Sequence, residues 1–361
     1  MSGVTRLPAV AATLTVAGLV VYTARHFGAG TNMLKLAAAA FALANLKHLP
    51  GFWHLRVLRG IIYQIYFQKT PIRPKHLFAP LITQSYNTPY DCDYNFHKSN
   101  STYFADLDVA RAHHVSAITR EGIARLRRGD QEGLPKSNVE AKGQYIVALG
   151  GVTCFFQRQI EPLQQFEIYT RVQSWDRKWL YVVSHIVKKG AIKPDSYVLQ
   201  PWKNREKKGT AGKKNGEQEE DLTKYIFATS LSRYVFKKGR LTINPEIVLE
   251  RSRLLPPRPA GVGYPPRTEE ASGTSSGTPL FEPATPSGEK GGKEENMSNE
   301  LRSRLAGVKG GEAQEDEEWT WDDMEKERLR GLELASHFDA LGGIHGELRG
   351  GHVLGKFGDY W

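Results

Sequence analysis

The sequence DCDYNFHKSNSTY, residues 91–103, joins an apolar, β-rich lead-in to a long helical pattern. The lead-in, 78–90, is interrupted by Pro80 and Pro89, which predicts an edge or bent strand. From Ser101 onward, residues suited to one buried helix face recur at three- and four-residue intervals, at Tyr103, Leu107, Ala110, His114, Ala117, Ile118 and Ile123. The quoted stretch therefore lies where a strand gives way to a helix.

Four polar side chains stand at this junction: Asp91, Asp93, His97 and Asn100. The backbone N–H groups at a helix start lack partners, and the helix dipole is positive there. Such a place favours a site that holds a carboxylate and polarises a carbonyl group.

The junction and a later turn together carry a family resemblance. Asp91 and Asp93, then His97, Asn100 and Tyr103, follow the order D-x-D, H-x-x-N and Tyr, and residues 175–181, WDRKWLY, match a W-D-x-K-W-x-Y turn between strands. From about residue 77 to residue 245 the chain resembles the hot-dog thioesterase-like superfamily (4-hydroxybenzoyl-CoA thioesterase-like). Within it, the chain is most similar to the group of thioesterase superfamily member six and its fungal relatives. It departs at Ser99, where that pattern often has Asn.

The resemblance implies an α+β fold, with a single hot-dog domain in which an antiparallel sheet wraps around one long helix. It implies hydrolysis of acyl thioesters such as acyl-CoA, with Asp93 as the nucleophile or general base, and neither a cofactor nor a metal. It also implies a homodimer that builds the pocket between subunits. The alternative is a hot-dog domain without turnover that binds acyl groups or acts as a scaffold at a membrane.

The other residues of the stretch are candidates for binding or orienting substrate: Asp91, His97, Ser99, Asn100 and Tyr103. Each has a structural alternative as well. Asp93 can cap the helix without reacting, Asp91 can fix the loop through hydrogen bonds, and His97 can be a buried, satisfied histidine. Asp108 and Arg111, three residues apart, predict an ion pair within the helix.

Charge and cysteine content exclude several classes of protein. The net charge of +10 is compatible with an anionic membrane surface or an anionic substrate such as a CoA ester. No zinc-finger, RNA-recognition or helix-turn-helix pattern favours nucleic acid. The two cysteines, Cys92 and Cys154, indicate neither a disulfide framework nor a cysteine metal site.

The first ninety residues contain no acid, and three apolar runs lie among their Lys and Arg residues. Residues 7–24 are uncharged, and at ~1.5 Å per residue they reach across a hydrocarbon core of ~30 Å. Residues 36–46 and 61–67 are shorter and suit an interface. We therefore expect 1–76 to be a membrane anchor with interfacial helices and the domain to stay cytoplasmic, at the endoplasmic reticulum. A mitochondrial presequence is the alternative.

Composition divides residues 77–361 into a folded domain with an insertion, a linker and a C-terminal segment. The hot-dog domain is expected over 77–253, with a disordered Lys-, Glu- and Gly-rich insertion at 202–221. Residues 254–316 read as a disordered linker, and 317–361 as a helix and a flexible end. The sequence GTSSG at 273–277 matches a nucleophile elbow, but it lacks the strand and helix that such an elbow requires.

Overall fold

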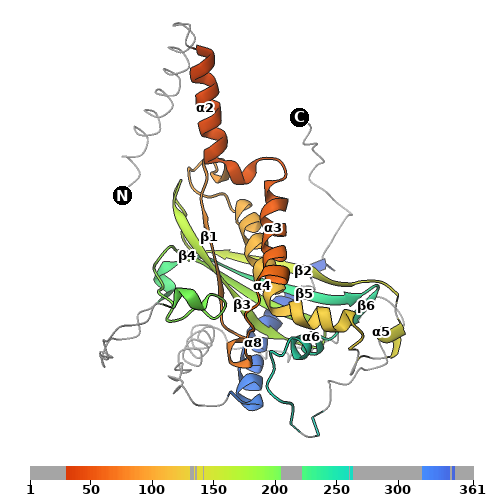
Figure 1. Cartoon of the computed structure of the whole chain (residues 1–361). Coiled ribbons are helices and arrows are strands. Elements are labelled where there is room, and N and C mark those ends of the chain that lie inside the picture. Colours follow the sequence, from red (N-terminus) through yellow and green to blue (C-terminus); the bar gives the residue numbers. More distant parts are fainter. Residues whose placement is uncertain are drawn as a thin grey trace, which may run out of the picture.

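The computed structural model describes residues 30–130, 134, 136–140, 142–204, 222–259, 261–262, 319–341 and 344–345. Its centre is an antiparallel sheet in the order β1-β3-β4-β5-β2, with β6 paired to β5 (Figure 1). The strands are β1 (Leu81–Tyr86), β2 (Tyr145–Phe156), β3 (Gln165–Trp175), β4 (Trp179–Lys188), β5 (Ile226–Lys238) and β6 (Leu241–Ile243). The lead-in strand β1 is at an edge of the sheet, as its prolines predicted.

One long helix, α4 (Thr102–Arg127), packs on β1, β3 and β4. Its buried face carries the periodic residues of the sequence: Tyr103, Leu107, Ala110, His114, Ala117 and Ile118 are all buried. The first half of this face meets Ile168 and Ile186 of the sheet, and the second half meets Val172 and Val182. The prediction of an antiparallel sheet around one long helix is confirmed.

The turn between β3 and β4 is built around Asp176. Its Oδ1 accepts hydrogen bonds from the backbone N–H groups of Lys178 and Trp179, both at 2.6 Å, and its Oδ2 accepts one from the Tyr181 hydroxyl at 2.9 Å. The carboxylate thus accepts hydrogen bonds from backbone N–H groups that a tight turn leaves without backbone partners. This explains why Asp and Tyr stand at these positions of the W-D-x-K-W-x-Y pattern.

The pair Gly150–Gly151 forms a bulge in β2, where the register with β5 shifts between Leu149 and Gly151. A Cβ atom on Gly150 would run into the ring of Trp179. Glycine is therefore required here for close approach.

Of the residues before β1, those from Asn45 onward pack on the domain, whereas the helix 30–44 projects away from it (Figure 1). The helices are α2 (Gly30–Ala44), η1 (Leu46–His48), α3 (Phe52–Ile62), the one-turn π-helix η2 (Tyr63–Phe67) and η3 (Pro74–His76). The α3 helix lies against α4 so closely that a Cβ atom on Gly60 would meet the His113 ring. Residues from Asn45 onward therefore pack with the domain, whereas the sequence placed them in the segment 1–76 of membrane anchor and interfacial helices.

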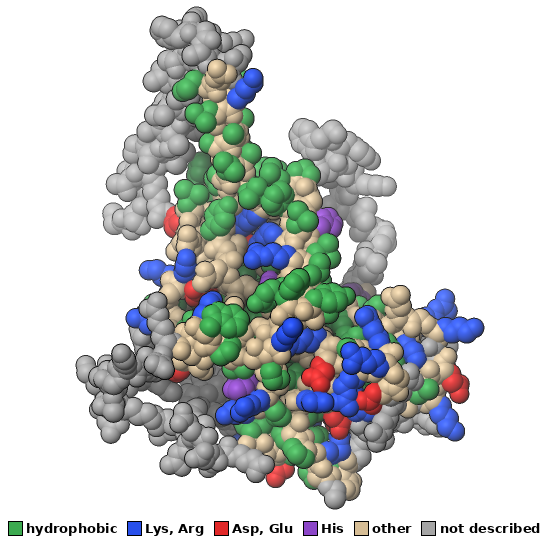
Figure 2. Space-filling model, in the orientation of Figure 1, with side chains coloured by type: hydrophobic (Ala, Val, Ile, Leu, Met, Phe, Trp, Pro, Cys, Tyr) green, Lys and Arg blue, Asp and Glu red, His purple; other side chains and the backbone are tan. Residues whose placement is uncertain are grey.

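Within the described residues, no helix is long and apolar enough to cross a membrane. The run 7–24, on which the predicted transmembrane helix depends, lies outside them. The two shorter runs are helical and expose large apolar side chains, among them Leu36, Phe41, Leu43, Ile62, Tyr66 and Phe67. Figure 2 shows hydrophobic side chains gathered along α2 and around the start of α3.

The chain continues to pack beyond the expected end of the domain. The short helix α6 (Pro245–Arg251) contacts α4, and Leu254 and Leu255, which the sequence assigned to the linker, are buried in the core. Most of the expected linker, and residues 205–221 of the expected insertion, lie outside the described residues. Short helices also occur at η4 (Pro89–Asp91), α5 (Lys136–Glu140), η5 (Pro201–Lys203) and η6 (Leu222–Tyr225).

The C-terminal helix α8 (Trp321–Ala340) docks on β3. The Ser174 hydroxyl donates to the Arg328 carbonyl at 2.6 Å, and the Arg328 guanidinium donates to the Trp175 carbonyl at 2.9 Å. A Cβ atom on Gly331 would run into the Gln173 carbonyl, so the helix and the strand are in backbone contact. The sequence predicted the helix but not the face that it covers.

Candidate active site

The loop between β1 and α4 is held by a capping box at η4. The Thr88 N–H donates to Asp91 Oδ2 at 2.9 Å, and the Asp91 N–H donates to Thr88 Oγ1 at 3.2 Å. Cys92 then pairs with Lys98 in an isolated antiparallel bridge. Residues 93–97 between them form a tight turn.

Asp93 and His97 face each other across this turn. The Asp93 N–H donates to the His97 carbonyl and the Phe96 N–H donates to the Asp93 carbonyl, both at 3.0 Å. Phe96 has a φ of 59°, in the left-handed region. The backbone around Asp93 is therefore fixed on both sides.

The loop is also tied to the segment that follows β2. The Asn87 side-chain amide donates to the carbonyls of Ile160 and Glu161 at 3.0 and 2.9 Å, and the Lys98 N–H donates to the Ile160 carbonyl at 2.9 Å. The Tyr103 ring meets that of Phe156, at the end of β2, with centroids 5.0 Å apart. These contacts bring the loop beside the C-terminal end of β2.

Asp91, the first acid of the D-x-D motif, is buried and fully paired. Its side chain is 1% exposed and lies 2.5 Å from Lys47 Nζ, 2.8 Å from His48 Nε2 and 3.3 Å from Lys98 Nζ. Burial alone would raise the pKa of Asp91, but Lys98 and Lys47 overcome this effect and lower it. Asp91 fixes the loop. Because these contacts occupy its carboxylate, it is not free to bind a substrate.

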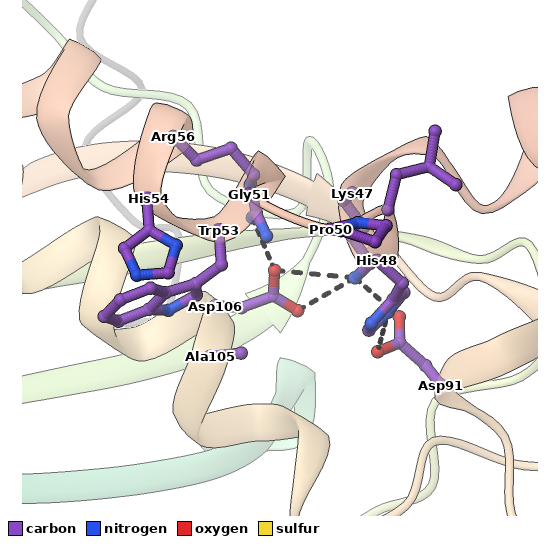
Figure 3. Close-up of a pocket in the computed structure, with 11 residues that line it drawn as sticks. Lys47, His48, Pro50, Gly51, Trp53, His54, Arg56, Asp91, Ala105 and Asp106 are labelled. Atoms are coloured by element: carbon purple, nitrogen blue, oxygen red, sulfur yellow. Dashed lines mark hydrogen bonds and ion pairs between the residues drawn. The ribbon is translucent and has the colours of Figure 1, made fainter.

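A second buried acid, Asp106 on α4, completes a charge cluster. Asp106 lies 2.6 Å from Arg56, 2.9 Å from Lys98 and 3.1 Å from Lys47, and it accepts a hydrogen bond from the Ser85 hydroxyl at 2.9 Å. In Figure 3, Lys47 lies between Asp106 and Asp91. Burial opposes ionisation of Asp106, but the cations lower its pKa well below the ordinary value. The cluster joins η1, α3, β1 and α4.

Sequence reasoning missed this cluster, because its members are spread from residue 47 to residue 106. Two signals were present. The long run without acids before Asp91 leaves Lys47 no local partner. Asp106 lies on the helix face that carries Tyr103 and Ala110, and an acid on a buried face requires a cation as its partner.

Asp93, the second acid, has the opposite environment. Its side chain is 26% exposed, its Oδ1 accepts one hydrogen bond from the Asn95 N–H at 2.8 Å, and His97 Nδ1 lies 3.8 Å away. It does not cap α4, because its contacts stay within the turn. Its carboxylate keeps capacity for a further partner.

The remaining predicted site residues divide between loop and core. Ser99 donates its N–H to the Asp91 carbonyl at 2.8 Å, and its hydroxyl lies 3.1 Å from that of Ser101. Asn100 is exposed. Tyr103 is buried beside Lys98, and burial raises the pKa of its hydroxyl. The structure thus places Asp93, His97, Ser99 and Asn100 near the surface and Asp91 and Tyr103 beneath it.

A cleft of about 250 Å³ opens beside the charge cluster and is lined by Trp53, His54, Ala105 and cluster members. Asp91 lines it, whereas Asp93 does not. Over the described ranges, no group of three or more His, Cys, Asp and Glu side chains is placed to hold a metal ion.

Comparison with known proteins connects this loop to one family. The model of the thioesterase-like superfamily matches residues 88–199, which begin at the Thr88 capping box and include Asp93. "Probable thioesterase atnL" from Emericella nidulans is 34% identical over 277 residues, which cover 71% of this chain and 83% of that protein. "Thioesterase poxG" from Penicillium oxalicum is 30% identical, with 88% of each chain covered.

A vertebrate protein also matches. "Protein THEM6" from Xenopus laevis is 29% identical over 167 residues, or 45% of this chain and 68% of that protein. The resemblance found in the sequence, both to the superfamily and to this group with its fungal relatives, is confirmed.

Proposed function

The chain belongs to the thioesterase-like superfamily, and on that basis we propose that it hydrolyses acyl thioesters with Asp93 as the catalytic carboxylate. One observation carries the assignment to Asp93. Of the two acids in the motif, Asp91 is buried among three basic side chains, whereas Asp93 is partly exposed on a rigid turn with a single side-chain hydrogen bond. Only Asp93 is free to meet a substrate.

Two routes lead from this carboxylate to the products. In the first, an Asp93 oxygen attacks the thioester carbonyl carbon, the C–S bond breaks and the thiolate leaves, and water then hydrolyses the acyl–aspartyl anhydride. In the second, Asp93 takes a proton from a water molecule that attacks the same carbon, and the proton passes to the leaving sulfur. Both routes release a carboxylic acid and a thiol.

The start of α4 supplies donors for the developing oxyanion. The Thr102 N–H already donates to the Ser99 carbonyl at 3.0 Å, but Ser101, the N-cap residue, makes no side-chain capping bond, so the N–H groups that follow Thr102 in the first turn are not occupied by a side-chain cap. They and the positive end of the helix dipole stabilise negative charge on a thioester oxygen. His97, 3.8 Å from Asp93, orients the carboxylate in this proposal.

A second subunit completes the pocket in our proposal. β2 is at an edge of the sheet, and it exposes Ile146, Leu149, Phe155 and Phe156. An exposed apolar edge strand is a liability that pairing with another copy removes. Because the Asp93 loop lies beside the end of β2, a homodimer joined there would enclose Asp93 in a cleft.

We further propose an acyl-CoA substrate and a membrane location. The net charge of +10 favours the anionic CoA group. The exposed apolar side chains of α2, α3 and η2 favour contact with lipid, with 7–24 as the anchor and the domain on the cytoplasmic side of the endoplasmic reticulum. Import into mitochondria is the alternative.

The test is thiol release from a panel of acyl-CoAs of increasing chain length by the full chain in native membranes. Single turnovers in ¹⁸O-water, followed by mass analysis of the Asp93 peptide, test the anhydride route: ¹⁸O in Asp93 identifies an anhydride that water opens at the aspartyl carbonyl carbon, because general-base catalysis places ¹⁸O only in the released acid. Sedimentation of the solubilised protein measures the dimer. No thiol release with any chain length would overturn the enzymatic proposal.

A second candidate function is an acyl-group binder without turnover. It is favoured by one observation: Asp93 lines neither the cleft described above nor the larger cavity described below. Saturable acyl-CoA binding without thiol release would support this candidate.

A further inference from the structure

A large cavity of about 1120 Å³ lies between α3–η2, the middle of α4, β1 and the segment 190–203 that follows β4. Pockets for small molecules typically measure ~300–1,000 Å³. The cavity shares Arg56 with the cleft but contains no residue of 91–103. Its first residue on α4, Val109, is seven residues beyond Thr102, or about 10 Å along the helix axis. It is therefore distinct from the site around Asp93.

Buried polar side chains without partners line this cavity. Within the described part of the chain, His114 Nε2, Gln64 Oε1 and His76 Nδ1 have no hydrogen-bond partner, although His114 and Gln64 are only 2% and 4% exposed. A buried polar atom without a partner costs free energy, so such atoms are rare in folded proteins. Three of them among the residues that line one cavity, on η2, η3 and α4, indicate a ligand that satisfies them.

These groups suit a ligand that accepts hydrogen bonds. Burial and Arg171 lower the pKa of His114 to about 3, so its ring is neutral and carries one N–H donor. Burial and nearby Lys75 and Arg73 also lower the pKa of His76, which favours its neutral form. The Gln64 amide presents its NH₂ group when it rotates by half a turn.

The charges around the cavity favour an anion. Arg59 from α3 and Lys193 and Lys203 from the 190–203 segment line it. Glu167 is the one acidic side chain among the described lining residues, and it already accepts hydrogen bonds from the Gln84 amide and the Gly190 N–H. A net positive rim next to neutral donors stabilises a carboxylate or phosphate.

The rest of the wall is apolar and suits a hydrocarbon chain. Ile72, Leu81, Ile82, Val109, Ala117 and Ile118 are among its members. Next to the cavity residues Tyr63 and Gln64, the exposed Ile65, Tyr66 and Phe67 of η2 present an apolar surface to the outside. A ligand with a chain would meet apolar side chains both on η2 and within the cavity.

We propose that this cavity binds a single-chain amphiphile with an anionic head group, such as a fatty acid. The head group meets His114, Gln64 and Arg59, and the chain lies along Val109, Ala117 and Ile118. This site does not depend on thioester hydrolysis at Asp93.

The test is photolabelling of the full chain in membranes with a diazirine-bearing fatty acid, followed by peptide mapping of the adducts. We expect adducts on 59–72, 109–118 and 190–203. Oleate or lysophosphatidate should compete with the photolabel, and the stronger competitor identifies the head group as a carboxylate or a phosphate. The cationic amphiphile oleylamine should not compete. Adducts confined to 30–58, outside the expected ranges, or equal competition by oleylamine, would overturn the proposal.

Single substitutions test whether the photolabel binds inside the cavity. Val109→Trp, which fills the cavity from a part-buried position, should abolish it, whereas Ala112→Trp, part-buried on the same helix but not lining the cavity, should leave it unchanged. Arg59→Glu should weaken labelling, and Lys188→Glu, an exposed control outside the cavity, should not.

Gln64→Met separates recognition from folding. Loss of one hydrogen bond to the head group should weaken labelling about tenfold. The melting temperature should not fall, because the variant removes a buried polar atom that has no partner in the protein. A lower melting temperature with unchanged labelling would assign Gln64 a structural role and contradict the proposal.

Discussion

Replacing Asp106 with Asn should destabilise the protein more than any change to an exposed acid. Asp106 faces Lys98, Lys47 and Arg56 at 2.9, 3.1 and 2.6 Å. Each such pair amounts to about 4 kcal/mol or more at an effective dielectric constant of ~20, before desolvation is subtracted. Arg56 is 24% exposed, so its share is reduced by solvent screening.

The net loss of stability comes from the buried lysines that Asp106→Asn leaves with too few carboxylate partners. With Asp106 neutralised, Lys98 and Lys47 share one carboxylate, Asp91, in a buried site. Removing one partner of a buried ion pair costs about 3–5 kcal/mol, because the other charge stays buried without compensation. We expect a loss of that size for Asp106→Asn at pH 7.

The assay is urea unfolding of the full chain followed by tryptophan fluorescence, with extrapolation to zero urea. Asp322→Asn, which changes an exposed acid on α8, is the control and should shift stability by less than about 0.5 kcal/mol. The pKa of Asp106 is lower in the folded protein than its ordinary value of 3.8, so its contribution is present above that pH and is lost as the pH falls below it. A cost under about 1 kcal/mol at pH 7 would refute the reasoning, because the buried cations would then not need this carboxylate.

Three further predictions concern packing and pH. Gly150→Val should cost about 1–3 kcal/mol on thermal unfolding, since its side chain would displace Trp179. Gly331→Ala should push α8 away from the Gln173 carbonyl, and hydrogen exchange should show faster exchange in α8 than in the wild type. Burial lowers the pKa of His185 from 6.5 to about 4, so the unfolded chain binds the extra proton and stability should fall as the pH drops from 6.5 to about 4. His185→Gln should flatten that part of the stability curve; an unchanged slope would exclude His185 as its source.

The parts of the fold that the sequence predicted are those with a long or distinctive local pattern. The period of α4 and the turn built on Asp176 are both local, because each depends on residues within one element or one hairpin. The packing of α8 on β3 is not local: Ser174 and Arg328 are 154 residues apart. Leu254 and Leu255 were missed because two apolar residues are too few to show a period.

The candidate site shows the same limit. Asp91 and Asp93 are the same residue type two positions apart, and nothing in the motif says which one is buried. That choice is made by Lys47 and Lys98, and Lys47 is 44 residues from Asp91. The sequence pointed to this loop as the candidate site, but the different environments of its two acids could be seen only in the three-dimensional contacts.

The most direct test of the catalytic assignment is the rate of acyl-CoA hydrolysis by Asp93→Asn beside that of Asp322→Asn, each at a saturating concentration of the best substrate in the panel. Asn keeps the shape of Asp93 and the bond from the Asn95 N–H, so the melting temperature should match the wild type. We predict that kcat falls about 100-fold or more for Asp93→Asn and is unchanged for the control. A kcat within twofold of the wild type for Asp93→Asn would contradict the central claim.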